Sequence, residues 1–308
     1  MAGGRVSDIV SMTEAGVDLV FNRAAKMPRR KYYSQIVWEM QQKKRTGNYH
    51  TMGDLGPAEE KTEADIITFD RVQENYETNI TSTTKSKGVE ASLEQLEYDL
   101  ERVVESRFGA GLMRVMQTYK EKVCADLYND AFATTGADGV YQIDDDHPLQ
   151  NDSSLENDNL ATGALTPDNL IAAKNKFNMI YDQAGDFFDS EPTHLLINKN
   201  KLFTALMILE SQLMAMELSN NKNVVEDAMP LKIVVNPYID YTVATGVSPW
   251  FLLDRTLTDA GAVLQKKRGM WLKTWWENNN QVFRGAALEM YGAGVISPGY
   301  GIVGSTGA

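Results

Sequence analysis

Three histidines and a single cysteine are the side chains from which this sequence could most readily build a catalytic site. His50, His147 and His194 are widely separated, and no Gly-x-Ser-x-Gly nucleophile elbow accompanies them. Neither a phosphate-binding Gly-x-x-x-x-Gly-Lys-[Ser/Thr] loop nor a dinucleotide-binding Gly-x-Gly-x-x-Gly after a strand is recognised. Cys124 lies in an apolar helical run, where a packed thiol is expected rather than a nucleophile. We therefore assign no catalytic residue and no cofactor, and expect a protein that is not an enzyme.

The run Asp144–His147 comes closest to a metal-binding motif. An EF-hand loop needs glycine at its sixth position and glutamate at its twelfth, where a loop beginning at Asp144 has Leu149 and Leu155. We assign no metal site, although opportunistic binding of a divalent cation by the acidic stretch stays open. His147, which precedes a proline, is interpreted as the start of a turn, and His194 as a hydrogen-bonded core histidine.

The charge distribution argues against a dedicated nucleic-acid reader. The formal net charge of the 308 residues is −12, whereas such proteins are normally basic. Residues 1–50 nevertheless carry nine basic and four acidic side chains, so a basic arm precedes an acidic body. The arm suits docking onto a neighbouring copy, but an ordinary solvated helix face would look the same. A cluster of Trp271, Trp275 and Trp276 could stack on bases or sugars, although anchoring of an apolar surface is favoured.

Composition indicates a folded protein made in the cytoplasm. Hydrophobic residues make up 43% of the chain, enough for one or two domains with a sizeable core. We find no signal peptide and no apolar run near the length of about 20 residues that a membrane span needs. One cysteine cannot form an intrachain disulfide, which fits a reducing compartment.

The N-terminal third predicts helical pieces followed by an extended hairpin. Residues 7–45 have helical spacing interrupted at Pro28, with a second helix over 31–45. Residues 46–60 are rich in turn formers. Two alternating stretches, 65–70 and 76–83, then predict strands of a hairpin. This ribbon has few large apolar side chains and an isolated two-stranded ribbon is marginal in water, so we expect it to lie on another polypeptide.

A long helix and a mixed α+β body follow. Ser92 and Gln95 fit a capping box, and an apolar stripe predicts a helix of about 40 residues, about 60 Å long, with a bend or break at Gly109 or Gly111. Residues 134–164 are expected to form an acidic loop, and Thr166 to cap the next helix. Strands are predicted over residues 194–197, 232–235, 250–254, 281–288 and 295–303, and a helix over residues 199–218.

The order of basic arm, hairpin, very long helix and α+β body resembles the Hong Kong 97-type fold of tailed-phage capsid proteins. The runs Asp146–Leu149, Leu165–Pro167, Phe283–Gly285 and Tyr291–Val295 are similar to Mu-like phage head subunits. The resemblance implies an α+β fold with an N-terminal arm (1–45), an extended loop (46–91), a spine helix with part of a peripheral domain (92–165), an axial domain (166–270) and returning strands (271–308).

The resemblance also implies a major capsid protein that assembles with copies of itself, through hexamers and pentamers, into an icosahedral shell around double-stranded DNA. We expect it in the virion capsid after assembly in the host cytoplasm. A separate scaffolding protein, a portal, decoration proteins and non-specifically contacted DNA would be its other partners, with no membrane. The residues expected at subunit interfaces are Arg29, Arg30, Lys31, Lys43, Lys44, Arg45, Lys61, Ile66, Phe69, Tyr76 and Ile80.

Several finer points and rival functions accompany this interpretation. Some relatives cross-link a loop lysine to an asparagine, for which Lys61 and the amides of 278–280 would be the nearest candidates, but no motif matches. The hairpin begins so early that we expect no fused scaffold. The alternatives are an encapsulin-type nanocompartment shell, a cytosolic enzyme with residues 134–164 as a lid, and a tail or decoration protein, which the long helix disfavours.

Overall fold

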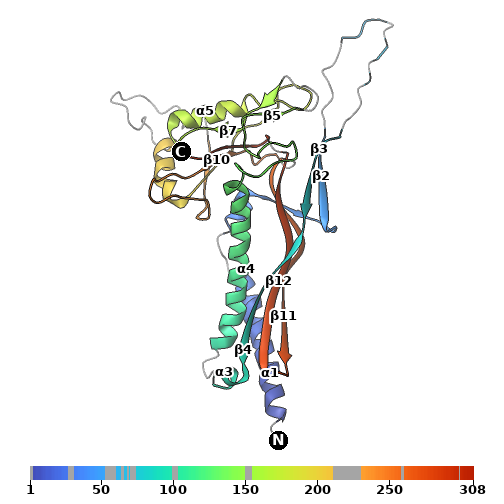
Figure 1. The fold of residues 1–308 in the computed structure, drawn as a ribbon, viewed down its shortest axis with the longest axis vertical. Coiled ribbons are helices and arrows are strands. Elements are labelled where there is room, and N and C mark those ends of the chain that lie inside the picture. The colour runs from blue at the N-terminus through green and yellow to red at the C-terminus, as the bar shows by residue number, and fades with distance from the viewer. Residues whose placement is uncertain are drawn as a thin grey trace.

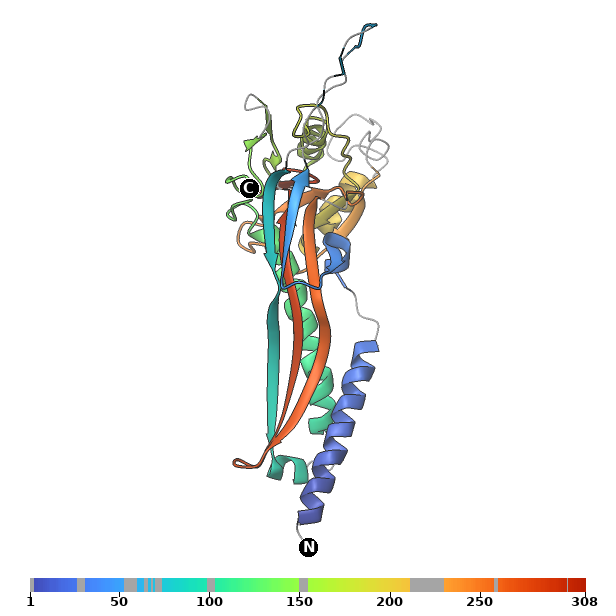
Figure 2. The same cartoon turned by 90° about the vertical axis from the view of Figure 1, so that its right-hand side faces the viewer.

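A computed structural model describes residues 3–26, 31–52, 60–63, 66–67, 69, 74–98, 103–149, 155–210, 230–257, 260–297 and 299–308. An elongated body carries a mixed domain at one end, and residues 60–63, 66–67 and 69 lie beyond that domain (Figures 1 and 2). The helices are α1 (Gly3–Lys26), α2 (Tyr33–Ile36), α3 (Leu93–Tyr98), α4 (Val103–Asn129), α5 (Pro167–Phe177), the 3-10 helix η1 (Lys199–Lys201) and α6 (Leu202–Leu209). The strands are β1 (Trp38–Gln41), β2 (Thr46–Met52), β3 (Glu74–Thr81), β4 (Thr83–Ser92), β5 (His147–Pro148), β6 (Glu156–Asn157), β7 (Leu160–Ala161), β8 (His194–Ile197), β9 (Lys232–Val235), β10 (Trp250–Leu253), β11 (Gly261–Glu277), β12 (Val282–Ile296) and β13 (Ile302–Ser305).

The body is a four-stranded sheet with the long helix α4 on one face (Figure 1). β11 and β12 pair antiparallel over most of their length, β4 pairs with β12, and β1 joins β11 in parallel. Leu112 and Met116 of α4 pack in one cluster with Ala287 of β12, and removing such side chains from water stabilises the layer. α1 lies along α4 (Figure 2), and a Cβ at Gly109 would come within 2.7 Å of the backbone nitrogen of Phe21. Glycine is therefore required where the two helices meet.

The mixed domain is built on a five-stranded sheet in the order β7-β13-β10-β8-β9. The side chains of Trp250, Leu195, Phe177 and Leu170 are fully buried in its core, so α5 packs on the sheet. The strands predicted over residues 194–197, 232–235 and 250–254 are confirmed, and the α+β class with them. The run Gly299–Gly304 does have Gly-x-Gly-x-x-Gly spacing, but it leads into β13 and not into a helix, so it lacks the helix N-terminus that binds phosphate.

Two predicted helix starts are confirmed in detail. The Ser92 hydroxyl accepts the N–H of Gln95 at 3.3 Å, and the Gln95 side chain accepts the N–H of Ser92 at 3.1 Å, which completes the capping box. The Thr166 hydroxyl accepts the N–H of Asn169 at 3.3 Å, with Pro167 in the first turn. Local hydrogen bonding between neighbours in the chain therefore decides both boundaries.

The predicted helix over residues 31–45 is wrong. A single short helix, α2, is followed by strand β1, which pairs in parallel with Val263–Lys266 of β11. Tyrosine, valine and tryptophan in this stretch are also good strand formers, and pairing with a distant strand overrides the helical spacing. The exposed turn at residues 42–45 then leads into β2.

The predicted pairing of the hairpin is also wrong. β3 pairs with β2, with Thr46 opposite Thr81, and not with the described residues 66, 67 and 69; residues 65, 68 and 70 of the predicted strand lie outside the described residues. Ile66, Ile67 and Phe69 belong to no strand. The glycines near residue 47 suggested a turn, yet the residues around Gly47 form half of the ribbon. The hairpin is therefore longer at its base than expected, and the exposed apolar residues lie beyond the paired strands.

The remaining differences concern length and continuity. α4 continues through Gly109 and Gly111 without the predicted break. β11 was not predicted, because the charged residues 266–268 interrupt its alternation. Residues 134–164 contain β5 and β6, which pair with one another, and β7, which joins the mixed domain. No helix in the described ranges is long and apolar enough to cross a membrane.

The contact between β3 and β12 supplies a stability prediction. A Cβ at Gly292 would lie 2.7 Å from the carbonyl oxygen of Thr81, so Gly292→Ala should lower the free energy of unfolding by about 1–3 kcal/mol through overpacking. Gly111→Ala is the matched control, because its Cβ would meet no atom within 4 Å and alanine is favoured in a helix by about 0.5–1 kcal/mol. Denaturant unfolding of both variants measures the difference. Equal effects of the two substitutions would contradict the close approach.

Candidate assembly surfaces

The base of the hairpin is fixed to the body of its own chain. Ile80 of β3 is 3% exposed and packs with Val263 and Ile296. The hydroxyl of Tyr49 donates to the side-chain oxygen of Gln265 at 3.0 Å, and the same Gln265 donates to the hydroxyl of Ser82 at 2.9 Å. Ile80 was predicted to face a neighbouring copy, and this expectation is wrong because β12 and β11 of the same chain already bury it.

The residues beyond the base have the opposite character. Ile66 is 92% exposed, Phe69 is 84% exposed and Ile67 is 59% exposed. Lys61 is exposed as well. Figures 1 and 2 show that the described pieces of this segment, residues 60–63, 66–67 and 69, lie away from both the body and the mixed domain. Three large apolar side chains that lie close together in the sequence are thus left exposed, and we call Ile66, Ile67 and Phe69 the apolar patch.

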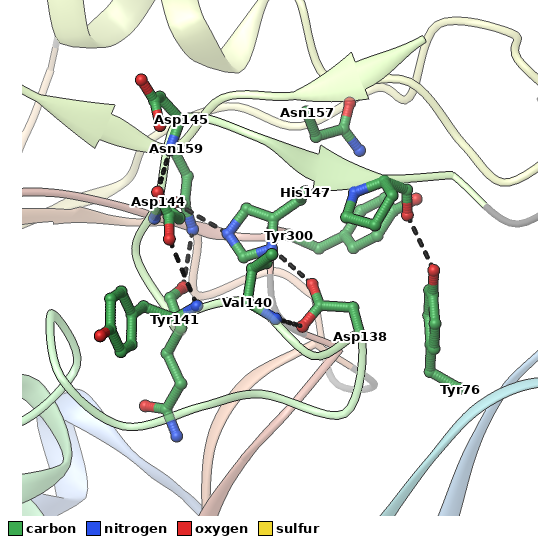
Figure 3. A network of polar contacts seen from close by, with 12 residues as sticks. Tyr76, Asp138, Val140, Tyr141, Asp144, Asp145, His147, Asn157, Asn159 and Tyr300 are labelled. Atoms are coloured by element: carbon green, nitrogen blue, oxygen red, sulfur yellow. Dashed lines mark hydrogen bonds and ion pairs between the residues drawn. The ribbon is translucent and has the colours of Figure 1, made fainter. Parts of the chain in front are cut away.

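A buried polar network joins the hairpin to the mixed domain (Figure 3). The hydroxyl of Tyr76 in β3 donates to the carbonyl of Pro148 in β5 at 3.0 Å. The neighbouring His147 is 3% exposed, with its Nδ1 2.5 Å from Asp138 and its Nε2 3.1 Å from Asn159. Burial, together with the negative charge of Asp138, raises the pKa of Tyr76, which keeps its hydroxyl protonated as a donor. The hairpin is therefore positioned by a side-chain contact in addition to its packing.

Asn159 fixes the orientation of this network. Its amide oxygen accepts the N–H of Asp144 at 2.8 Å, and its amide nitrogen donates to the carbonyl of Gln142 at 3.0 Å. The side-chain oxygen is thus turned toward His147, so both ring nitrogens of the histidine face acceptor oxygens. Sequence reasoning singled out His147 but not its two partners, which lie 9 and 12 residues away in an apparently irregular loop.

The acidic run next to the network brings three carboxylates together. The carboxylates of Asp144, Asp145 and Asp146 lie within 4.8 Å of one another, and the last two are exposed. Burial acts against ionisation of Asp144, but hydrogen bonds to Asp145 and from the N–H group of Tyr141, with the nearby His147, together outweigh it and lower the pKa of Asp144. Backbone N–H groups therefore use part of the hydrogen-bonding capacity of the Asp144 carboxylate.

The basic arm is described in part. Lys31 is exposed, as are Lys43, Lys44 and Arg45 in the turn between β1 and β2, whereas Arg29 and Arg30 lie outside the described residues. The start of α2 is held by Glu121 of α4, whose carboxylate accepts the N–H groups of residues 32 and 33 at 3.1 and 2.7 Å. Burial raises the pKa of Glu121, and these hydrogen bonds oppose that effect.

The other candidate residues are surrounded by packing or hydrogen-bonding neighbours. Cys124 is fully buried, and burial raises its pKa to about 12, which agrees with a packed thiol. Trp276 packs beside a small core cluster, and the guanidinium of Arg268 lies 4.0 Å from the ring centroid of Trp271. His194 contacts the hydroxyl of Thr193 at 2.8 Å, as expected for a hydrogen-bonded histidine.

This architecture is similar to that of several shell-forming proteins. The asymmetric unit of the mature capsid of bacteriophage PhiM1 is similar with a TM-score of 0.57 and 9% identity over 91% of this chain and 88% of that one. The capsid of cyanophage Pam1 gives 0.56 and 12%, over 91% and 92% of the two chains. The SrpI encapsulin of Synechococcus elongatus PCC 7942 gives 0.54 and 10%, over 91% and 88%. At such low identity these likenesses establish the Hong Kong 97-type fold.

The sequence itself identifies the family. A family model described as phage capsid protein matches residues 75–302, well over half of the chain. No curated protein matches the sequence. The chain belongs to the phage capsid protein family, and it is a structural protein of the viral shell. The similarity to Mu-like head subunits in particular stays a resemblance.

The polar network gives a prediction for stability. Asp138→Ala should lower the free energy of unfolding by about 1–3 kcal/mol, because the buried Nδ1 of His147 would lose its partner. Asp145→Ala removes an exposed carboxylate from the same loop and should change the free energy by less than about 0.5 kcal/mol. Chemical denaturation of the unassembled subunit measures both. A cost for Asp138→Ala no larger than that of the control would show that the network contributes nothing.

The histidine of β8 gives a prediction for pH. Burial, with the positive charges of Lys232 and Arg255, lowers the pKa of His194 below its ordinary value of 6.5. The unfolded chain therefore takes up a proton below about pH 6.5 that the folded chain resists, so stability is full above that pH and falls on acidification. His194→Gln should reduce the fall in melting temperature between about pH 7 and about pH 5.

His50→Gln is the matched control, because His50 is exposed in β2. Its melting temperature should follow the same pH dependence as that of the unmodified chain. Thermal unfolding across the pH series compares the three proteins, and superimposable curves for His194→Gln and the unmodified chain would exclude this histidine as the source.

Proposed function

We propose that the chain is the major subunit of an icosahedral phage head and that each copy lays its hairpin on a neighbouring copy. The exposed apolar patch of Ile66, Ile67 and Phe69 carries this proposal. Full burial of each such side chain would contribute about 1.5–3 kcal/mol. One contact of this size is modest, but each subunit of a closed shell makes and receives several, and their effects combine.

The arrangement of the hairpin supports this role. Its base is packed against β12, and the hydroxyl of Tyr76 donates a hydrogen bond to the carbonyl of Pro148. The subunit itself would therefore set the direction in which the hairpin leaves the body. A projection held at its base and uncovered at its end is suited to reach another molecule. The domain division at residues 45, 91, 165 and 270 is part of the proposal, with residues 92–165 as spine and residues 166–270 as the axial domain.

The net charge of the chain supports double-stranded DNA as the cargo of the shell. A net charge of −12 disfavours tight adhesion to double-stranded DNA, so the packaged genome would be held by confinement rather than by the shell wall. The exposed Lys31, Lys43, Lys44 and Arg45 would contact acidic surfaces of neighbouring subunits. A separate scaffolding protein, a portal and decoration proteins would be further partners, with assembly in the host cytoplasm.

An encapsulin-type shell is the second candidate, because the SrpI encapsulin has a similar fold with a TM-score of 0.54. The family match to phage capsid proteins favours the phage head. Particles purified from the native source separate the two functions: a phage head should contain double-stranded DNA, whereas an encapsulin shell should contain a protein cargo.

The apolar patch provides the direct test. The double variant Ile66→Ser/Phe69→Ser should fold normally, because both side chains are exposed, yet its critical concentration for assembly should rise at least about tenfold, which corresponds to about 1.4 kcal/mol. Val243→Ser is the control, since Val243 is 85% exposed in the mixed domain. Sedimentation and negative-stain microscopy measure the particles. A wild-type yield of shells from the double variant would show that the patch takes no part in the assembly contact.

A further inference from the structure

The backbone of the chain has one step that is chemically reactive. Asp138 is followed by Gly139, which is the only Asp-Gly pair of the sequence, and the sequence has no Asn-Gly pair. In such a pair the backbone nitrogen of the glycine can attack Cγ of the aspartate, because glycine has no side chain to hinder the approach. A bond forms between that nitrogen and Cγ, while the amide proton and the carboxyl hydroxyl leave as water. Water then opens the resulting succinimide, mainly at the main-chain carbonyl, and leaves an isoaspartate.

Gly139 lies in an exposed turn that favours this attack. A Cβ built on it would meet no atom within 4 Å, so the space around the glycine is open. Its N–H donates to the carbonyl of Gly136 at 3.4 Å, which is longer than an ordinary backbone hydrogen bond. Because the turn is exposed, water also reaches it, and the hydrolysis that completes the conversion needs no other reactant.

The side chain of Asp138, in contrast, is held away from the reaction (Figure 3). It is 2% exposed, its Oδ2 lies 2.5 Å from Nδ1 of His147, and its Oδ1 accepts the N–H of Val140 at 3.4 Å. A rotation that brings Cγ toward the nitrogen of Gly139 would break the contact with His147. A carboxylate paired with histidine is also a poor electrophile, since release of water requires a neutral carboxyl group. The ring can therefore close only after Asp138 and His147 have separated.

We propose that Asp138–Gly139 is a site of isoaspartate formation and that the contact with His147 controls its rate. The rate in the folded chain equals the rate of the unrestrained pair multiplied by the fraction of molecules in which this contact is open. Isoaspartate carries its carboxylate directly on Cα, one carbon closer to the main chain than in aspartate. The contact with His147 therefore does not re-form after the conversion.

The modification also affects the attachment of the hairpin to the mixed domain. Pro148, the residue after His147, accepts a hydrogen bond from the hydroxyl of Tyr76 at 3.0 Å. Once Asp138 no longer holds the imidazole, the segment that carries this acceptor loses one of its fixed points. A subunit whose network has opened is thus marked covalently. The chemistry needs only the folded subunit and water, so the proposal does not rest on the shell function.

Incubation of the full chain at neutral pH, followed by peptide mapping, tests the proposal. Mass spectrometry with electron-transfer fragmentation distinguishes aspartate from isoaspartate and gives the rate of conversion at Asp138. In the native chain this rate should be at least about tenfold lower than in the same chain unfolded in denaturant. This comparison uses only the unmodified sequence, so it holds even where a variant fails to fold.

Three variants separate the contact with His147 from other effects. His147→Ala removes the imidazole that holds Asp138 and should raise the rate in the folded chain at least about fivefold. His50→Gln changes an exposed histidine and should leave the rate unchanged. In the unfolded chain, Gly139→Ala should slow the conversion about tenfold, because a side chain then hinders ring closure. Circular dichroism verifies that each variant measured as native is folded.

The contrary outcomes are equally clear. Equal rates in the native and the unfolded chain would show that the fold does not restrain Asp138, and the proposal would be overturned. A folded His147→Ala chain that converts at the unmodified rate would overturn control by His147. The absence of isoaspartate at Asp138 in the unfolded chain as well would exclude the pair as a site of modification.

Discussion

A two-stranded ribbon cannot stabilise itself in water, and this constraint organises the molecule. At the base, the ribbon of β2 and β3 gains stability from the body, where Ile80 is buried and Gly292 allows the backbones to approach. Beyond the base the chain offers no such support, and Ile66 and Phe69 are exposed. In the proposed shell, a neighbouring copy would supply the stabilisation that the monomer lacks at this end, and folding of the hairpin would then be linked to assembly.

The network around His147 explains how the projection keeps its direction. Packing at the base alone would allow the hairpin to rotate about that contact. The hydrogen bond from the Tyr76 hydroxyl to the Pro148 carbonyl attaches β3 to the mixed domain at a second point. Asp138 and Asn159 hold His147, the residue before this proline, from both sides of its ring. A buried network with paired members is rigid, because each group would lose its partner on moving. The hairpin and the mixed domain therefore move together.

Sequence patterns predicted those features of the fold that interactions between neighbouring residues determine. The caps at Ser92 and Thr166, the buried strand at residues 194–197 and the apolar stripe of α4 all follow from neighbours in the chain. The parallel pairing of β1 with β11 joins residues more than 200 positions apart, and no local signal specifies it. The hydrogen-bond partners of His147 were not predicted for a similar reason, because these loop residues come together only when the chain has folded. The lack of cover over Ile66 and Phe69 was predictable, because the ribbon has too few large apolar side chains to form a core of its own.

A hairpin end that lies on a different part of the neighbouring subunit would make a heterologous contact. Such a contact closes into a ring when the rotation between successive copies divides a full turn, and otherwise continues as an open filament. That rotation depends on the angle at which the hairpin leaves the body, and this angle is set by Ile80, Gly292 and the bond from Tyr76 to Pro148. Weak contacts at the exposed end would permit misplaced subunits to dissociate, while the packed base would preserve the angle. Closure of the shell therefore depends on strong interactions within the subunit and modest ones between subunits.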